Sequence, residues 1–308
     1  MKRQTRLREL TSQTWRTIGA RQWSSEIDTV TAAIEAIPLP EVEDDDPLTL
    51  PSLARFEAIA EWSRSTPDGQ RRSRLIEHRD KLRRWAEYAE TMRKRRDAFA
   101  SSPHVHPTAH TFDSWIFGSD EHAKERAAVW AWCTRWAVEQ SKRRDRTRNV
   151  VLASHRKGSG KSHLAAAMAY ECCLAGQWVA VWPVNEMFRA VKATFDNRSK
   201  TTADDFIDGW QRCDVLVIDD MGTHRGTAWE LGEILWPIVD ARCKHDRATI
   251  ITTNHAPVDE AGWVAMLGGD QAETPGHIER MVSRLREDAR LLPMQWADWR
   301  QRKTENGR

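Results

Sequence analysis

The stretch NVVLASHRKGSGKSHLAAAMAYECCLA, residues 149–175, places a short apolar run, a glycine-containing loop and an apolar segment in succession. Residues 149–153 predict a buried strand, and residues 163–175 are rich in strong helix formers and predict a helix. The loop between them matches the pattern GxxxxGK[ST], except that His155 stands where the first glycine is expected. Because a strand precedes the loop and a helix follows it, the stretch predicts a phosphate-binding loop.

The residue types of this loop suit the binding of a nucleotide phosphate. Gly158 and Gly160 allow the backbone to curl so that its amide N–H groups point inward, and the N-terminus of the following helix adds partial positive charge. Lys161 would reach the β and γ phosphates of ATP, and the hydroxyl of Ser162 would bind Mg²⁺. We therefore expect the nucleotide to contact His155, Arg156, Lys157, Gly158, Ser159, Gly160, Lys161, Ser162 and His163.

His155 is the departure that bears on whether the loop is active. A residue with a Cβ is tolerated there only if its backbone is not forced to a positive φ. The position leads into the loop and does not wrap the phosphates, so we expect the histidine to reshape the entrance without abolishing binding. Whether its imidazole slows turnover is left open.

Two further apolar runs end in polar residues that could complete the site. DVLVIDDMG, residues 214–222, predicts a buried strand with Asp219 and Asp220 at its C-terminal end, and ATIITTN, residues 248–254, predicts another that ends at Asn254. Open α/β sheets bind ligands at that edge. Asp219 would face the metal, Asp220 would orient or deprotonate the attacking water, and Asn254 would hold the water or the γ phosphate. Taken singly, each feature also occurs in ordinary turns.

The pattern of the whole chain predicts two parts. From residue 111 onward, short apolar strands alternate with helices, which is typical of an α/β fold with a parallel sheet covered on both faces. Before it lie amphipathic helical stretches, an acidic, proline-rich linker at residues 38–51 and a proline- and histidine-rich hinge at residues 101–110. We expect a helical N-terminal partner-binding domain over residues 1–105 and an ATPase domain over residues 106–308.

Composition restricts the possible partners and compartment. The chain has 308 residues, is 40% hydrophobic and carries a net charge of +2, so any affinity for nucleic acid depends on local patches. Residues 71–96 hold one such basic patch, which could meet nucleic-acid phosphates or an acidic partner, although a run of charge on a helix is more often a solvated face. The five cysteines lack CxxC spacing and predict reduced, mostly buried thiols. Without a signal-peptide or membrane-spanning pattern, we expect a soluble cytoplasmic protein.

Three segments together carry a family resemblance. GKSHLAAAMA, DVLVIDDMGTHRGTAWELGEILWPIVDARCKHDRATIITTN and ERMVSRLRED closely resemble the DnaC/DnaI/IstB group of AAA+ ATPases, which are bacterial and phage helicase loaders and transposition helpers. The likeness covers about residues 111–302. It implies a parallel five-stranded sheet flanked by helices, with Lys161 and Ser162 as the Walker A residues. It also implies Asp219 as the Walker B magnesium ligand, Asp220 as the hydrolytic acid and Asn254 as sensor 1.

The same resemblance implies that hydrolysis requires self-association. The segment RMVSRLR resembles the one that supplies an arginine finger to the neighbouring subunit, and Arg284 is its best match. Arg280 is the alternative. Either residue is also explained as an ordinary surface arginine on an amphipathic helix. Most AAA+ proteins have glutamate where this chain has Asp220, and a shorter carboxylate would hold the water less closely. We therefore expect slow, assembly-dependent ATP hydrolysis.

Loaders of this group use a helix after the second strand to follow single-stranded DNA. Here WVAVWPV is that strand, and NEMFRAVKATFDNRSK follows it with basic residues at 189, 192, 198 and 200 interleaved with Phe188 and Phe195. Phe188, Arg189 and Lys192 are the candidate DNA contacts. Phenylalanines in such a segment are more often core, so we expect at least one to be buried. The basic segment SKRRDRTR, residues 141–148, is a second candidate, or it simply caps the preceding helix.

Three functions fit these observations. The leading one is a loader that binds a hexameric DnaB-type replicative helicase through its N-terminal helices and helps place it on single-stranded DNA. The second is an IstB-like ATPase that helps DNA transposition. The third is an adaptor that binds ATP with little hydrolysis. A multi-helix N-terminal region behind an acidic linker favours the first.

Overall fold

The computed structural model of the protein describes residues 20–39, 53–100, 110–141, 149–196, 200–223, 226–267 and 276–296. Contacts divide the chain into two compact units, Met1–Lys94 and Arg95–Arg308, so the division falls within a helix. The boundary predicted after residue 105 lies outside the described residues, as do most of the predicted linker at 38–51, the basic residues 142–148 and the last residues of the resemblance.

The first unit is helical. It contains α2 (Ala20–Glu35), α3 (Leu53–Ser65) and most of α4 (Pro67–Ala100). Val30 and Ile34 of α2 are buried in a small cluster with Leu82 of α4, in keeping with the apolar spacing of both helices. The turn between α3 and α4 is tight, because the Thr66 hydroxyl accepts a hydrogen bond from the N–H of Gly69 at 3.0 Å.

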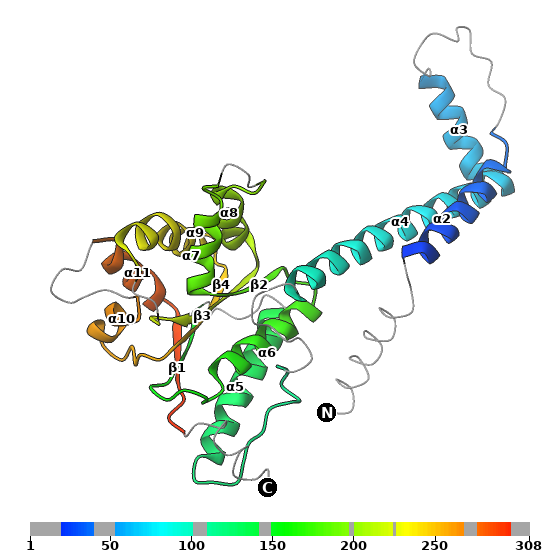
Figure 1. Ribbon diagram of the computed structural model, residues 1–308. Helices are drawn as coiled ribbons and strands as arrows, with labels where there is room; N and C mark the ends of the chain where they lie inside the picture. Colours follow the sequence, from blue (N-terminus) through cyan, green and yellow to red (C-terminus); the bar gives the residue numbers. More distant parts are fainter. Residues whose placement is uncertain are drawn as a thin grey trace. The chain divides into compact units, whose positions relative to one another are not determined.

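The second unit is built on a parallel sheet of five strands in the order β2-β3-β4-β1-β5 (Figure 1). The strands are β1 (Asn149–Ala153), β2 (Val179–Pro183), β3 (Val215–Met221), β4 (Ala248–Thr253) and β5 (Ala289–Pro293). The predicted five-stranded α/β fold is confirmed. In this order β1 lies between β4 and β5, and β3 beside β4, so the loops after β1, β3 and β4 open at one edge of the sheet.

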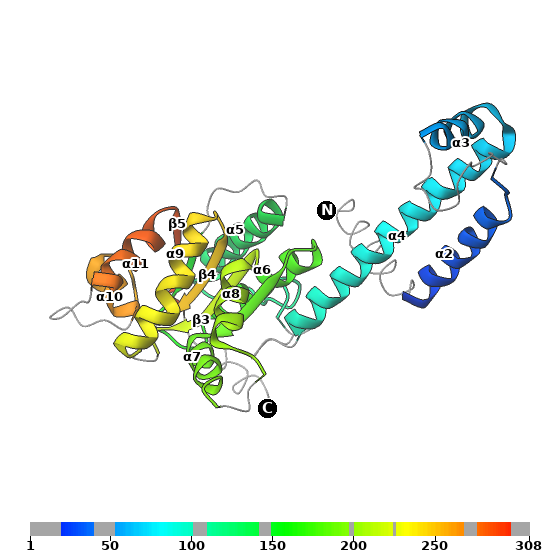
Figure 2. The same cartoon turned by 90° about the horizontal axis from the view of Figure 1, so that it is seen from above.

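Helices cover both faces of the sheet (Figure 2). Alternate residues of β1 show the two faces, since Val150 and Leu152 pack in one core and Val151 packs in the other. On the first face lie α5 (Ala123–Ser141) and α6 (Lys161–Leu174). On the second lie α7 (Val184–Ala193), α8 (Ala203–Arg212), the π-helix η1 (Glu230–Leu235), α9 (Trp236–Lys244), α10 (Glu260–Met266) and α11 (Gly276–Arg286).

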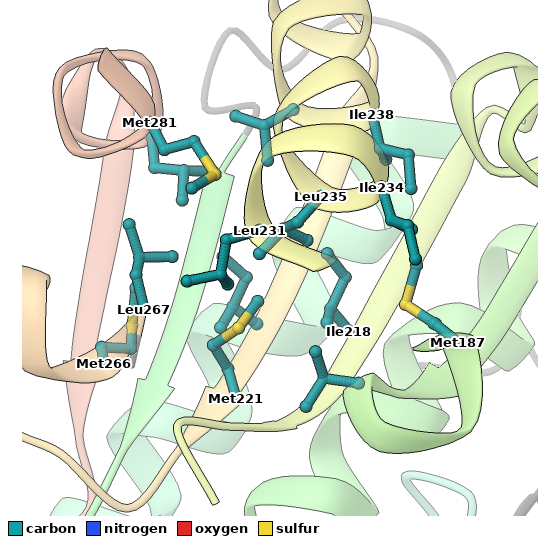
Figure 3. Close-up of a cluster of buried hydrophobic side chains, with 14 of the residues drawn as sticks. Met187, Ile218, Met221, Leu231, Ile234, Leu235, Ile238, Met266, Leu267 and Met281 are labelled. Atoms are coloured by element: carbon teal, nitrogen blue, oxygen red, sulfur yellow. The ribbon is translucent and has the colours of Figure 1, made fainter. Parts of the chain in front are cut away.

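The core of the second face is packed around η1 and α9. Figure 3 shows Leu231, Ile234 and Leu235 of η1 lying against Ile218 and Met221 of β3. Helix α9 begins at Trp236 directly after η1, and Pro237 is its second residue. Because proline has no N–H to donate to the preceding turn, the wider π-helical turn before it avoids a broken α-helical hydrogen bond.

Two further expectations concern the cysteines and the membrane. All five cysteines are free thiols; four are buried and Cys243 is half-buried, which confirms the expectation. Within the described ranges, no helix combines the length and the apolar character needed to cross a bilayer.

Candidate nucleotide-binding site

The loop after β1 has the backbone geometry that a phosphate cradle needs. Gly158 and Gly160 have φ angles of 68° and 92°, in the left-handed region that favours glycine. Gly160 precedes α6, which begins at Lys161, so the helix N-terminus faces the loop. These φ angles are the ones expected of two glycines that let the backbone of the loop curl.

The Lys161 side chain lies across the loop. It is 6% exposed, and its Nζ donates hydrogen bonds to the Arg156 carbonyl at 3.1 Å and to the Ser159 hydroxyl at 3.5 Å. The indole Nε1 of Trp296 donates to the Ser159 carbonyl at 2.7 Å and holds the loop from the far end of the chain. An ammonium group in this position can bind the oxygens of a phosphate in the cradle.

His155 lies at the rim of the loop. Its side chain is exposed and its φ is not positive, which confirms the expectation that a residue with a Cβ is tolerated there. Of the loop residues, those from Lys157 to His163 line the cavity beside the loop. His155 and Arg156 do not line it, although they were predicted among the nucleotide contacts.

The carboxylates at the end of β3 occupy an irregular part of the strand. The register of β3 on β4 shifts between Ile218 and Met221, and within this bulge Asp220 has a φ of 56°. The Thr252 hydroxyl accepts a hydrogen bond from the N–H of Asp220 at 2.9 Å and donates one to Oδ1 of Asp219. Asp219 is half-buried and Asp220 is exposed, so the bulge presents both carboxylates at the edge of the sheet.

The end of β4 and the residue His255 after it hold the end of β3 and Gly222, which follows β3. The imidazole Nε2 of His255 lies 3.2 Å from the Gly222 carbonyl, and the Thr253 hydroxyl donates to the Met221 carbonyl at 2.8 Å. Gly222 has a φ of 86°, and a Cβ there would come within 2.5 Å of the His255 ring. Only glycine fits this position without a shift of its neighbours. Asn254 lies between Thr253 and His255 in the sequence, and it lines the cavity at the carboxyl edge of the sheet.

One cavity of about 970 Å³ joins these elements. It brings together Lys161, Ser162, Asp219, Asp220 and Asn254, which the sequence places up to 93 residues apart, as predicted from the ends of three strands. The remaining lining residues are His110, Ser114, Trp115, Ile116, Arg126, Lys157, Gly158, Ser159, Gly160, His163, Pro183, Asn185, Thr223 and Trp296. Its volume is at the upper end for small-molecule sites and is sufficient for a nucleoside triphosphate.

The segment before α5 covers the phosphate loop. The sequence alone did not assign this segment to the site. His163 Nε2 lies 2.9 Å from the Thr111 carbonyl and 3.2 Å from the Ser114 hydroxyl, and its ring meets that of Trp115 edge to face. Burial lowers the pKa of His163, although the contact with Thr111 favours the charged form. A Cβ on Gly160 would lie 2.5 Å from the Trp115 ring, so the cover sits directly on the loop.

The donor set fits ATP with Mg²⁺. A hydroxyl, Ser162, and a carboxylate, Asp219, line the same cavity, and Mg²⁺ binds one or two such protein oxygens together with nucleotide phosphates. A cluster of three or more His, Cys, Asp or Glu side chains suited to a metal does not occur in the described part of the chain. The residues therefore suit a metal that arrives with the nucleotide better than one held by the protein alone.

The candidate arginine finger lies at the opposite edge of the sheet. Arg284 is near the end of α11, where the Asn149 amide, at the start of β1, donates to the Leu285 and Glu287 carbonyls. The Nε of Arg284 is 3.6 Å from Asp240, and the guanidinium of Arg280 lies over the Trp236 ring at 5.2 Å. Neither arginine lines the nucleotide cavity.

The helix after β2 holds only part of the predicted DNA contact. Phe188 is 3% exposed within the core, so the prediction that it contacts DNA is wrong, while the expectation of one buried phenylalanine is confirmed. Arg189 pairs with Glu186 at 2.7 Å, and Lys192 pairs with the buried Glu230 at 2.8 Å; both basic side chains are more than half exposed. An exposed aromatic does occur at the end of α7, where Phe195 meets Trp229 edge to face.

Comparison with known proteins supports a nucleotide-binding fold. The sequence profile of the family described as "IstB-like ATP binding protein" matches residues 137–306. A "Replicative helicase loader DnaC" of Buchnera aphidicola subsp. Schizaphis graminum is 30% identical over 151 residues, which are 49% of this chain and 56% of that protein. The DnaC of Escherichia coli K12 is 36% identical over 103 residues, or 33% and 41% of the two chains. The chain thus spans about half the length of the curated relatives it matches.

Among solved structures, "Crystal Structure of the DnaI" is similar with a TM-score of 0.48 and 18% identity, over 62% of this chain and 91% of that one.

Proposed function

The chain belongs to the family of IstB-like ATP binding proteins, and from that premise we propose that it is an assembly-dependent ATPase that loads a hexameric replicative helicase onto single-stranded DNA. The observation that carries the enzymatic part is the shared cavity of Lys161, Ser162, Asp219, Asp220 and Asn254. The helicase is proposed because curated relatives carry the name replicative helicase loader.

Five of the residues that line the cavity have a proposed task in hydrolysis. Lys161 binds the β and γ phosphates, and Ser162 and Asp219 hold Mg²⁺, which neutralises charge on the phosphates when it is bound. Asp220 accepts a proton from the attacking water, and Asn254 orients that water against the γ phosphate. Asp220 carries one methylene fewer than glutamate, so we propose that turnover is slow.

Single-stranded DNA is the proposed nucleic-acid ligand of the surface at the end of α7. Phe195 is 62% exposed, Trp229 is 41% exposed, and their ring centroids are 5.6 Å apart. Aromatic side chains on a surface can stack on unpaired bases, and the nearby Arg189 and Lys192 can neutralise phosphates. This surface takes the place of the Phe188 contact predicted from the sequence.

ATP binding is tested by the melting temperature of the purified chain. At 100 times its dissociation constant, a ligand adds about 2.7 kcal/mol to the free energy of unfolding, which corresponds to a rise of roughly 5–10 °C for the ATPase unit. Lys161→Ala should lose this rise, and Lys124→Ala, which changes an exposed lysine of α5, should keep it. A wild-type chain whose melting temperature ignores millimolar ATP and Mg²⁺ would contradict the proposal.

The partner is tested with the full chain in the presence of ATP. Co-elution with the host's hexameric helicase, and faster helicase entry onto circular single-stranded DNA, are the expected results. The match to the family of IstB-like ATP binding proteins favours a second candidate, an IstB-like ATPase that helps DNA transposition. Co-elution with a transposase on duplex DNA, and not with the helicase, would select that candidate.

A further inference from the structure

A single hydroxyl contacts both members of the carboxylate pair. Thr252 is fully buried in β4, and its Oγ1 accepts a hydrogen bond from the N–H of Asp220 at 2.9 Å. The same atom donates its hydrogen to Oδ1 of Asp219. An N–H can only donate and a carboxylate can only accept, so the hydroxyl accepts from Asp220 and gives its one hydrogen to Asp219.

The contact lies where the regular pairing of β3 with β4 stops. The register of the two strands shifts between Ile218 and Met221, so the backbone there is not held by an unbroken ladder. Within the bulge, Asp220 keeps a φ of 56°, which is uncommon for a residue with a Cβ and persists only when its surroundings hold it. The Thr252 hydroxyl supplies such a hold on the Asp220 N–H.

We propose that Thr252 is a positioning residue that orients the Asp219 carboxylate for the metal and fixes the backbone that carries Asp220. The inference rests on the proposed function, in which Asp219 contacts Mg²⁺. With Oδ1 occupied by the hydroxyl, Oδ2 of Asp219 is the oxygen free of this contact to turn toward the cavity. Partners that hold a ligating carboxylate tune metal affinity by about 10- to 100-fold.

The neighbouring Thr253 gives a matched control. It is also fully buried in β4, and its hydroxyl also bridges two backbone groups, because it donates to the Met221 carbonyl at 2.8 Å and accepts from the N–H of His255 at 3.1 Å. Neither of these contacts is with a carboxylate. A general loss of strand stability should therefore follow from either threonine, whereas an effect on the metal should follow from Thr252 alone.

The test is a Mg²⁺ titration of the ATP-dependent melting temperature, with the full-length wild-type chain and the variants Thr252→Val, Thr252→Ser and Thr253→Val. Thr252→Val should raise the Mg²⁺ concentration at the midpoint about tenfold. Thr252→Ser, which keeps the hydroxyl, should restore the wild-type midpoint within about twofold, and Thr253→Val should lower the unliganded melting temperature without moving the midpoint. Should Thr252→Val fail to fold, Thr252→Ala against Thr252→Ser makes the same comparison.

The outcomes separate this inference from the proposed function. An equal shift of the Mg²⁺ midpoint in the Thr252→Val and Thr253→Val chains would overturn the positioning role, because a structural loss would then explain both. A wild-type midpoint in Thr252→Val would overturn it as well, while ATP binding by the wild-type chain stood. A wild-type chain that ATP does not stabilise would instead overturn the proposed function, and this inference with it.

Discussion

The two edges of the sheet each hold a buried cation, and the surroundings of the two differ. At the carboxyl edge, Lys161 lines a cavity of about 970 Å³ and donates hydrogen bonds to the Arg156 carbonyl and the Ser159 hydroxyl of the phosphate loop. At the amino edge, Arg242 is 1% exposed and donates to the carbonyls of Trp210 and Cys213 at 2.7 and 2.9 Å. A cation beside open space can bind a ligand, whereas a cation enclosed by carbonyls joins segments of the fold.

The same comparison separates the candidate catalytic residues. Asp219, Asp220 and Asn254 share the carboxyl edge with Lys161, but Arg284 belongs to the amino edge with Asp240. A strand of five residues such as β1 is roughly 15 Å long, so Arg284 cannot reach the phosphates of its own chain without a large rearrangement. If Arg284 is a finger, it must serve a second copy of the chain.

The largest expected effect comes from removing that finger. Arg284→Ala should lower ATP turnover by about 10³-fold or more while the ATP-dependent melting shift stays at its wild-type size, because the residue lies outside its own cavity. Arg286→Ala, which changes an exposed arginine at the end of the same helix, should keep wild-type turnover. A loss of ATP binding in Arg284→Ala would contradict the separation of the two edges.

Mixing two inactive chains sharpens the test. Asp220→Asn removes the proposed base but leaves Arg284 in place, and Arg284→Ala does the reverse. If the finger acts between chains, an equimolar mixture should regain a measurable fraction of turnover that neither chain has alone. Failure of the mixture to regain any turnover, at concentrations where the wild-type chain is active, would mean that the two edges do not meet across subunits.

Substitutions of the two buried cations should differ in their effects on the free energy of unfolding and on ATP binding. Arg242→Met leaves at least two buried carbonyls without their donor and should lower the free energy of unfolding by about 3 kcal/mol or more. Lys161→Met should cost less stability and should abolish the ATP-dependent melting shift. Urea unfolding measures the first effect, with Arg212→Met as the control, since the Arg212 side chain is 65% exposed and pairs with a carboxylate, Asp208, that is 48% exposed. Equal losses of stability for both buried cations would break the comparison.

The sequence predicted the carboxyl edge well because its signals are local. A buried strand followed by a glycine loop, or by two carboxylates, can be recognised within about ten residues of sequence. The strands β1, β3 and β4 begin and end within a residue or two of the predicted runs. The strand β5 gave little signal, because ARLLP is short and only partly buried. Its predicted existence came from the family resemblance alone.

What the sequence could not predict are contacts between distant segments. Trp296 holds Ser159 across 137 residues, and the Thr111 segment meets His163 across 52, so no spacing pattern connects them. The prediction that Phe188 contacts DNA was wrong for a related reason. Its place among basic residues suggested a nucleic-acid contact, but the helical period puts it on the same face as Val184 and Val191, which are also core.

Glu230 tests whether every buried ion near the carboxyl edge serves ligand binding. It lines a small pocket near the carboxyl edge together with Thr223, but it is held by Lys192 and Thr227 as a structural ion. Burial alone would raise the pKa of Glu230, but the hydrogen bonds from Lys192 and Thr227 outweigh it and lower the pKa from 4.5 to about 2.

The pH dependence follows from the sign of that shift. A carboxylate whose pKa is lower in the folded chain stabilises it fully above its unfolded pKa, and the contribution is lost as the pH falls through the folded pKa. Glu230→Gln should therefore cost about 2 kcal/mol at pH 7, and its difference from wild type should shrink between pH 4.5 and pH 2. Urea unfolding across this range measures it, and Asp208→Asn, in an exposed pair, should show almost no such trend. A difference independent of pH would indicate lost packing in place of a lost charge.

The smallest effect is expected at His155, the residue that departs from the phosphate-loop pattern. Its side chain is exposed, its φ is not positive and it does not line the cavity, so a glycine there relieves no strain and removes no contact with the nucleotide. His155→Gly should change the ATP midpoint and turnover by less than about twofold, since exposed substitutions away from special backbone geometry have small effects. Gly158→Ala is the contrast inside the loop, because its φ of 68° strains any residue with a Cβ, and it should weaken ATP binding far more. A large rise in turnover for His155→Gly would show that the imidazole restrains hydrolysis from the rim, which would extend the active part of the carboxyl edge beyond the cavity.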